Sequence, residues 1–303
     1  MTPLPFCATM LSSKSHERKP IMRIGNCAGV TGDPLETLRH LKELGYDTAD
    51  VQLADTKQPW YHDTAEMERL CASVRAAADE ADIELFQMHG PWPTDDTTEE
   101  SRVQAWDYFH RAVYACHLLG AKYMILHPQM PYGWGGQEDP DVAEALTVAL
   151  LRDLLPDCEK YGVIVCLENM PFLKQRISTM DRIAAAVAQV DSPLVGICLD
   201  TGHVNVFEGH NLGDAVRIAA PYLRTVHVHD NDGKGDRHML PYLGTCDWDS
   251  FTTALAEIGF DGELTFEADN FIRKLPDELK MEGSSFMAKT GRYLISRFEA
   301  NCK

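Results

Sequence analysis

Short apolar runs alternate with longer amphipathic stretches along this chain from residue 21 onward. The short runs predict strands, and the stretches between them carry apolar residues at three- and four-residue spacing, which is typical of helices. Strands that are each followed by a helix indicate parallel α/β architecture. Eight strands are expected, at residues 21–25, 48–53, 83–89, 123–127, 163–168, 195–200, 225–229 and 264–267.

Capping residues mark the expected helix boundaries. The first helix is predicted to begin at the Asp33-Pro34 pair and to end at Gly45, because aspartate and proline favour a helix start and glycine favours its end. Further helices are expected at 101–120, 141–161 and 276–298. Pro156 is expected to kink or divide the helix in which it lies.

Eight strands that are each followed by a helix is the count of a closed (β/α)8 barrel, which typically needs about 250 residues as one domain. The sequence therefore predicts an α/β fold with a single (β/α)8 TIM-barrel domain over residues 21–303, preceded by a flexible tail at residues 1–20. An open doubly wound sheet would carry a glycine-rich phosphate motif after its first strand, and GNCAGVTG is a poor match to that motif.

Six of the predicted strands end on a side chain that can bind a metal ion or carry a proton. Successive end residues are 29 to 41 positions apart, about the length of one strand-helix-strand unit. The carboxyl ends of parallel strands meet at one mouth of a barrel, so the pattern predicts a ring of ligands at that mouth. The six residues are His89, His127, Glu168, Asp200, His229 and Glu267.

The bulk composition excludes several classes of protein. With 45% hydrophobic and 24% charged residues, the chain is expected to be globular, and no apolar run reaches the roughly 18 residues of a membrane span. The formal net charge of −18 disfavours a nucleic-acid partner. Nine single cysteines without a CxxC pair, and no signal-peptide pattern, favour a cytoplasmic location. The sequence leaves open whether copies of the chain form a homo-oligomer.

The strand-end residues of the second half suggest a catalytic metal site. Glu168 and Glu267 end the fifth and eighth strands and can face each other, so they could bind an ion and move protons at a carbon beside a carbonyl. Asp200 and His229 would complete a shell of oxygen and imidazole ligands. His227 points to the same side of its strand as His229, and we interpret it as a core histidine beneath the site. A solvated loop position is the alternative for either glutamate taken alone.

Additional candidate ligands follow the sixth and seventh strands. His203 comes three residues after Asp200, and the alternative is that Asp200 caps a helix while His203 is exposed. Asp236 and His238 could hold a further ion together with His203, or they belong to a solvated polar loop.

The third and fourth strands and the rim loops supply the remaining candidates. His89 and His127 are followed by Gly and Pro, where a strand opens into a loop, which favours contact with a metal or a substrate. A hydrogen bond to a backbone carbonyl is the alternative for either. Aromatic rim residues such as Trp92 and Trp134 suit stacking on a sugar face, or they anchor their loops.

These motifs together resemble the xylose isomerase-like barrel superfamily over roughly residues 21–298. The resemblance rests on LEN at Glu168, LDTGH at Asp200 and His203, HVHDND at His229 and FEAD at Glu267. The superfamily includes sugar epimerases of the tagatose 3-epimerase type, inosose and dehydroshikimate dehydratases, and endonuclease IV. In the epimerases the matching Glu, Asp, His and Glu hold one divalent ion, and the two glutamates act as acid and base through an enediolate. The resemblance implies a metal-dependent sugar isomerase or epimerase in which His203 contacts substrate.

Four further residues resemble ligands that give endonuclease IV-like enzymes three zinc ions, namely His89, His127, Asp236 and His238. This resemblance implies a trinuclear phosphodiesterase as the alternative, but the rim loops TDDTTEE and QEDPD are acidic where a duplex would bind. The arginine that epimerases place after the metal-binding histidine is Gly235 here, which leaves Arg237 as a nearby candidate for substrate contact.

We therefore expect a metal-dependent isomerase or epimerase with a small-molecule carbohydrate substrate. A keto-sugar lyase or dehydratase uses the same apparatus and is a close alternative. Mixed carboxylate and imidazole ligation suits Mn²⁺ or Zn²⁺, with Mg²⁺ and Co²⁺ as further options.

Overall fold

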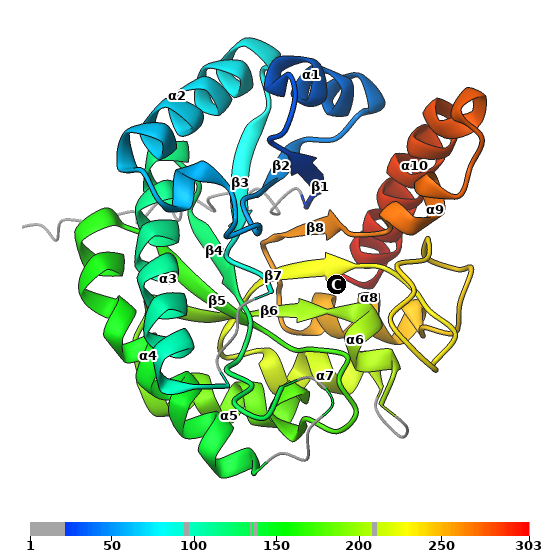
Figure 1. Cartoon of the computed structure of the whole chain (residues 1–303). Coiled ribbons are helices and arrows are strands. Elements are labelled where there is room, and N and C mark those ends of the chain that lie inside the picture. Colours follow the sequence, from blue (N-terminus) through cyan, green and yellow to red (C-terminus); the bar gives the residue numbers. More distant parts are fainter. Residues whose placement is uncertain (1–21, 94–96, 134, 136–138, 208–210, 303) are drawn as a thin grey trace, which may run out of the picture.

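The computed structural model describes residues 22–93, 97–133, 135, 139–207 and 211–302. Eight parallel strands close into a barrel in which each strand pairs with the next along the chain and β8 pairs with β1. The predicted single (β/α)8 TIM barrel is confirmed (Figure 1). The strands are β1 (Arg23–Gly29), β2 (Thr48–Gln52), β3 (Glu84–His89), β4 (Tyr123–Leu126), β5 (Ile164–Glu168), β6 (Val195–Asp200), β7 (Leu223–Val228) and β8 (Glu263–Phe266).

Helices surround the strand ring, with short helices where the chain crosses the rim (Figure 1). The long helices are α1 (Pro34–Leu44), α2 (Thr64–Ala81), α3 (Glu99–Leu119), α4 (Pro140–Tyr161), α5 (Met180–Val190), α7 (Leu212–Ala219), α8 (Trp248–Glu257) and α10 (Asp277–Asn301). The short ones are η1 (Pro59–Tyr61), η2 (Arg176–Ser178), α6 (Thr201–Asn205) and α9 (Asp269–Arg273). The predicted tail at residues 1–20 lies outside the described residues.

The bounds of several elements differ from the sequence predictions, and β1 and α4 are the informative cases. β1 continues to Gly29, four residues beyond the predicted end at Gly25, because residues 25–29 pair with β2 over its full length. α4 continues through Pro156 as one helix, so the predicted division does not occur. Leu154 and Cys158, on either side of the proline, are fully buried, and this packing holds the helix together despite the missing backbone donor. The predicted caps of α1 at Asp33 and Gly45 are both present.

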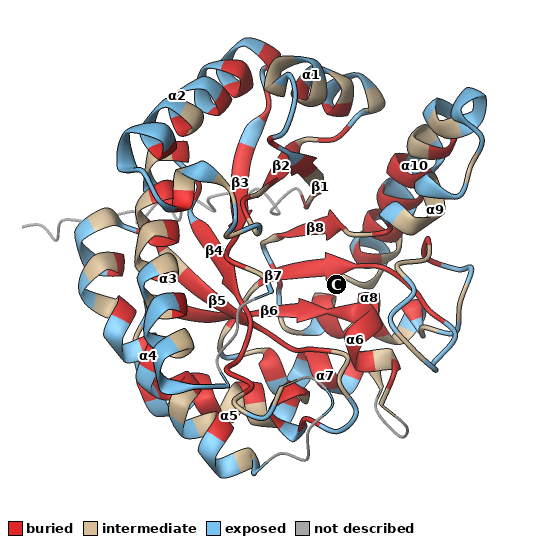
Figure 2. Cartoon of the chain, viewed as in Figure 1, coloured by how far each residue is buried: buried red, intermediate tan, exposed pale blue. Residues whose placement is uncertain are grey.

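Most strand residues are buried, whereas the outer helices have one buried and one exposed face (Figure 2). The main apolar core lies between strands and helices. Inside the barrel, a smaller apolar cluster contains Phe86, Ile125, Cys166 and Cys198. The interior residues nearer the carboxyl ends are polar, and this change in character positions the site. None of the helices in the described part of the chain has the length and apolar character needed to cross a membrane.

Candidate metal centre and active site

Four side chains from neighbouring strands form the principal group at the barrel mouth. Glu168 and Asp200 are the last residues of β5 and β6, His227 lies in β7, and Glu267 directly follows β8. One ligand atom from each residue lies within 4.8 Å of the others. His227 Nδ1 is 3.0 Å from Glu168 Oε1 and 3.4 Å from Glu267 Oε1. Both candidate acid-base glutamates therefore meet at one imidazole.

His229, which the sequence suggested for this group, lies outside it. β7 ends at Val228, and the advance of two residues from His227 moves His229 by roughly 6–7 Å along the strand direction. His229 Nε2 lies 3.0 Å from Asp200 Oδ1 and 3.6 Å from Asp236 Oδ1, in the loop after β7. The place beside the two glutamates belongs to His227, which was predicted to be a core histidine beneath the site.

A second group lies on the other side of Glu168. His89 ends β3 and His127 directly follows β4, and their Nε2 atoms are 3.2 Å apart. His127 Nε2 is also 3.2 Å from Glu168 Oε2. Because the two carboxylate oxygens of Glu168 point to different groups, this one side chain joins them. Both histidines thus lie in the site and are directed at its carboxylates, as expected for ligands.

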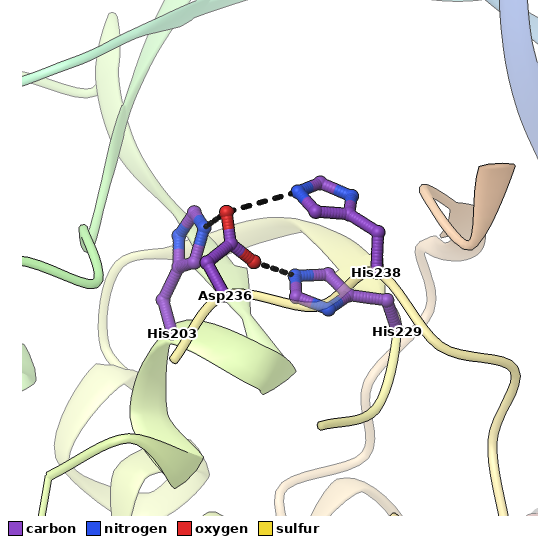
Figure 3. A group of neighbouring side chains, drawn as sticks. All are labelled: His203, His229, Asp236 and His238. Carbon is purple, nitrogen blue, oxygen red and sulfur yellow. Dashed lines mark hydrogen bonds and ion pairs between the residues drawn. The ribbon is translucent and has the colours of Figure 1, made fainter. Parts of the chain in front are cut away.

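Asp236 and His238, in the loop after β7, form a third group with His203 of α6, the short helix directly after β6. His203 Nε2 lies 3.6 Å from Asp236 Oδ2, and His238 Nε2 lies 3.0 Å from the same oxygen. Figure 3 shows these residues and His229 converging on Asp236. His229 and His238 stack with planes inclined by 6° and centroids 4.2 Å apart. An ion lies in the plane of an imidazole that binds it, so two parallel stacked rings cannot share one ion. His203, Asp236 and His238 are therefore the usable set.

Asp230, for which the sequence predicted no role, holds this loop in place. Its buried carboxylate accepts hydrogen bonds from the backbone of Asn231 at 2.8 Å, Tyr242 at 3.0 Å and Cys246 at 3.1 Å, and from the indole of Trp248 at 3.0 Å. The loop can thus present Asp236 and His238 to the mouth without a regular strand or helix. The sequence did offer a signal for this role, because Asp230 directly follows the predicted strand-end residue His229.

Asp200 and its neighbour Asn169 illustrate how strand ends are fixed. Asp200 Oδ1 accepts a hydrogen bond from His203 N at 2.7 Å, so Asp200 caps α6 as well as facing the site. The Asn169 amide donates to Asp200 O at 3.0 Å and its oxygen accepts from Asp200 N at 2.8 Å. Asp200 is therefore both the cap of α6 and a residue of the site.

The electrostatics of the groups favour carboxylates that stay ionised. Burial opposes ionisation of Glu168, but the charge of His227 and hydrogen bonds with His127 and His227 hold its pKa well below the usual range. Burial likewise opposes ionisation of Asp200, and the nearby imidazoles still lower its pKa. Burial lowers the pKa of His127 to about 4, which keeps this imidazole neutral, the form that binds metals.

The donor set fits divalent cations. Within the described part of the chain, Asp200 Oδ2 is a buried atom that accepts no hydrogen bond. A buried carboxylate oxygen without a donor is costly, and a coordinated cation removes that cost. Carboxylate oxygens mixed with imidazole nitrogens are the ligands that Mn²⁺, Zn²⁺ and related ions bind.

A pocket of about 420 Å³ opens onto the groups and carries an aromatic wall. The Trp92 ring lies edge-on to His127 with centroids 4.3 Å apart and 6.3 Å from Phe172. Trp92 therefore lies where the sequence placed a substrate contact. Arg237 does not line this pocket and lies 3.7 Å from Asp232, whereas Arg273 of α9 does line it. The other aromatic candidate, Trp134, lies outside the described residues.

The sequence profile of the xylose isomerase-like TIM barrel family matches residues 38–289. This chain belongs to that family. The xylose isomerase-like barrel is 27% identical over 239 residues to D-psicose 3-epimerase of Ruminiclostridium cellulolyticum, covering 76% of each chain. It is also 26% identical over 164 residues to the probable endonuclease 4 of Mesomycoplasma hyopneumoniae, covering 50% of this chain and 57% of that one.

Solved structures show the same fold. The xylose isomerase-like barrel superposes on a D-tagatose 3-epimerase-like protein with a TM-score of 0.73 and 20% identity, covering 93% of this chain and all of that one. At this identity the likeness supports the fold alone, so the choice of reaction depends on the site's own residues.

Proposed function

We propose that this barrel is a metal-dependent epimerase or isomerase that acts on a ketose or a related keto-sugar. The observation that carries the proposal is the meeting of Glu168 and Glu267 at His227, at 3.0 and 3.4 Å, in a pocket with an aromatic wall. Epimerisation beside a carbonyl needs one group that removes a proton from carbon and another that returns it from the opposite face. Glu168 at the end of β5 and Glu267 directly after β8 supply such a pair.

Glu168, Asp200, His227 and Glu267 would hold the principal ion. A divalent ion bound there would supply positive charge beside a substrate oxygen that becomes negative as a proton leaves the neighbouring carbon. Glu267 is the more accessible of the two glutamates, with a side chain 12% exposed against 1% for Glu168. Glu168, which the neighbouring imidazoles keep ionised, is thus suited to remove the proton from carbon, and Glu267, which can take a proton from solvent, to return one to the opposite face.

The pocket also fits a sugar-sized substrate. Trp92 and Phe172 offer ring faces and edges on which the C–H groups of a sugar pack. His203 lines the pocket beside the principal group and can donate to a substrate hydroxyl. The distribution of polar groups on one wall and aromatic rings on the other is what a small carbohydrate requires.

A second candidate function has its own supporting observation. The group of His89, His127 and Glu168 and the group of His203, Asp236 and His238 provide ligands for two ions beyond the principal one. Several ions can stabilise both the attacking and the leaving oxygen of a phosphodiester, as in a trinuclear hydrolase. We rank this candidate second because the chain's net charge of −18 opposes binding of a polyanionic duplex. A keto-sugar lyase would use the same two glutamates.

Three measurements on the purified protein separate these candidates. Metal-free protein is loaded with Mn²⁺ or Zn²⁺ and then incubated with D-psicose, D-tagatose and D-fructose, with a 3-keto-glucoside, and with duplex DNA that carries one abasic site. Interconversion of ketoses supports the proposal, and loss of the aglycone from the keto-glucoside supports the lyase. Incision of the duplex without any sugar turnover contradicts the proposal. Glu168→Gln serves as the inactive control in each assay.

A further inference from the structure

The last helix, α10, carries a line of exposed apolar side chains. Leu279, Phe286 and Tyr293 are seven residues apart, so they lie about two helical turns from one another along one side of the helix. The residues that α10 buries, such as Met287 and Leu294, lie on a different side. Figure 1 shows the N-terminal half of α10, with α9 beside it, extending away from the strand ring. The line is therefore accessible to a partner.

The loop after β7 extends this apolar surface. The Tyr242 ring lies edge-on to the Tyr293 ring, with centroids 5.7 Å apart, and Leu243 is the next residue of the loop. A hydrogen bond from Tyr242 N to Asp230 Oδ2, at 3.0 Å, holds the loop at this place. We call the combined surface the α10 patch; its residues, each between 47% and 55% exposed, are Tyr242, Leu243, Leu279, Phe286 and Tyr293.

The α10 patch gathers side chains that are elsewhere exposed only singly. Eleven large apolar side chains are exposed in the described residues, and five of them belong to the patch. Most of the others lie singly on α3, α4, α7 and two loops. Single exposed apolar residues are common on any protein, whereas a contiguous group marks an interaction surface.

Two charged residues of α10 lie beside the patch without a partner. Glu282 and Lys289 are exposed and lie four residues before and three residues after Phe286. Arg292 of the same helix is paired with Asp47, but Glu282 and Lys289 form no ion pair with any described residue. The centre of the patch thus has one free negative charge on its N-terminal side and one free positive charge on its C-terminal side.

This arrangement is complementary to itself when two copies of α10 run antiparallel about Phe286. Leu279 of each copy then lies opposite Tyr293 of the other, because both are seven residues from the centre. Glu282 of each copy comes within about one residue, roughly 1.5 Å, of facing Lys289 of the other. A parallel pair would place like charges beside each other, which is unfavourable.

We propose that the α10 patch is the contact surface of a two-fold symmetric homodimer of this chain. A two-fold contact uses the same surface of both copies, as this complementarity requires. Five half-exposed side chains of roughly 200 Å² each present roughly 500 Å². Two copies therefore bury roughly 1,000 Å² from the patch alone, which reaches the size of a specific interface. The net charge of −18 disfavours an anionic membrane as the occupant.

The first test compares Phe286→Asp with Val103→Asp. Val103 is an exposed apolar residue of α3, outside the patch, so its variant controls for the new charge. Sedimentation velocity of the full chain over a dilution series measures the dimer dissociation constant. We expect a wild-type dimer, a dissociation constant at least about 30-fold higher for Phe286→Asp, and little change for Val103→Asp. A monomeric wild type, or equal dissociation constants for Phe286→Asp and wild type, overturns the proposal.

Charge exchange tests the antiparallel pairing with surface variants that leave the core unchanged. Glu282→Lys and Lys289→Glu should each weaken the homodimer, because like charges then face each other. The double variant should restore it, and a mixture of the two single variants should form the heterodimer in preference to either homodimer. Weakening by both single variants without recovery in the double variant or the mixture contradicts the antiparallel pairing.

Discussion

His229 and His238 stack face to face, with ring centroids 4.2 Å apart and planes inclined by 6°. This contact ties His229 to the loop after β7 and leaves His227 beside Glu168, at 3.0 Å. His227→Ala should therefore weaken the first equivalent of Zn²⁺ by more than about 100-fold, since removing a ligand costs more than removing its hydrogen-bond partner. His229→Ala should change that affinity by less than about tenfold. Competition titrations with both variants make the comparison, and the reverse ranking would return His229 to the principal group.

Asp230 anchors the loop that carries the third group, so its loss should be felt in stability. Asp230→Ala leaves three backbone donors and the Trp248 indole without their acceptor. Unpaired buried donors cost about 1 kcal/mol or more each, so we expect a loss of about 3 kcal/mol in the free energy of unfolding. Urea denaturation measures the loss. Asp232→Ala, in the same loop but partly exposed, is the control and should lose less than about 1 kcal/mol. Equal losses would contradict the anchoring role.

Glu263 should make stability fall with rising pH. Burial raises its pKa to about 8 from 4.5, and hydrogen bonds from Thr48 and Thr265 with the charge of Arg23 only partly offset this. Between these two values the folded chain keeps a proton that the unfolded chain releases, so stability is full below 4.5 and is lost as pH rises through 8. Glu263→Gln should flatten this dependence and raise the melting temperature at pH 8. Melting curves that keep the wild-type pH dependence would show that Glu263 is ionised at neutral pH.

His110 should act in a comparable way on the outside of the barrel. It lies between Asp157 at 2.7 Å and Asp153 at 2.9 Å, joining α3 to α4. Burial lowers its pKa, but the hydrogen bonds and charges of the two aspartates outweigh this and raise it above 6.5. The stabilisation is present below 6.5 and is lost as pH rises through the raised value. His110→Gln should therefore destabilise the protein more at pH 6 than at pH 9, as measured by urea denaturation. A constant difference would contradict the ion pair.

The barrel fold and the strand ends that form its mouth could be predicted from the sequence, because both depend on the local pattern of apolar and polar residues. Each of the eight apolar runs overlaps a strand of the barrel, and Glu168 and Asp200 are the last residues of their strands, as predicted. The sequence favoured His229 over His227, whereas the structure places His227 beside the two glutamates, because the position depends on where β7 stops and how far two residues advance along it. Both histidines point inward, so periodicity alone does not separate them.

Asp50 and Arg237 show two further limits of the sequence. Alternate polar residues within the second strand, TADVQ, were a usable signal that the strand presents polar groups to the barrel interior. Their partners come from β3 and β7, far away in the sequence, so the cluster appears only when the barrel closes. Arg237 was suggested by its nearness to the strand-end histidines, but the loop directs it toward Asp232 and leaves Arg273 at the pocket.

The central claim is that Glu168 and Glu267 exchange a proton at a carbon beside a carbonyl. Transfer of solvent deuterium into a ketose tests it most directly, with Mn²⁺-loaded protein, D-psicose or D-fructose in D₂O, and ¹H NMR of the recovered sugar. We expect deuterium at the epimerised carbon with the wild type, and at least about a 100-fold slower exchange with Glu267→Gln. Glu263→Gln, a buried carboxylate remote from the mouth, should exchange at nearly the wild-type rate. Exchange by Glu267→Gln at the wild-type rate, or none by the metal-loaded wild type with any ketose, would contradict the account.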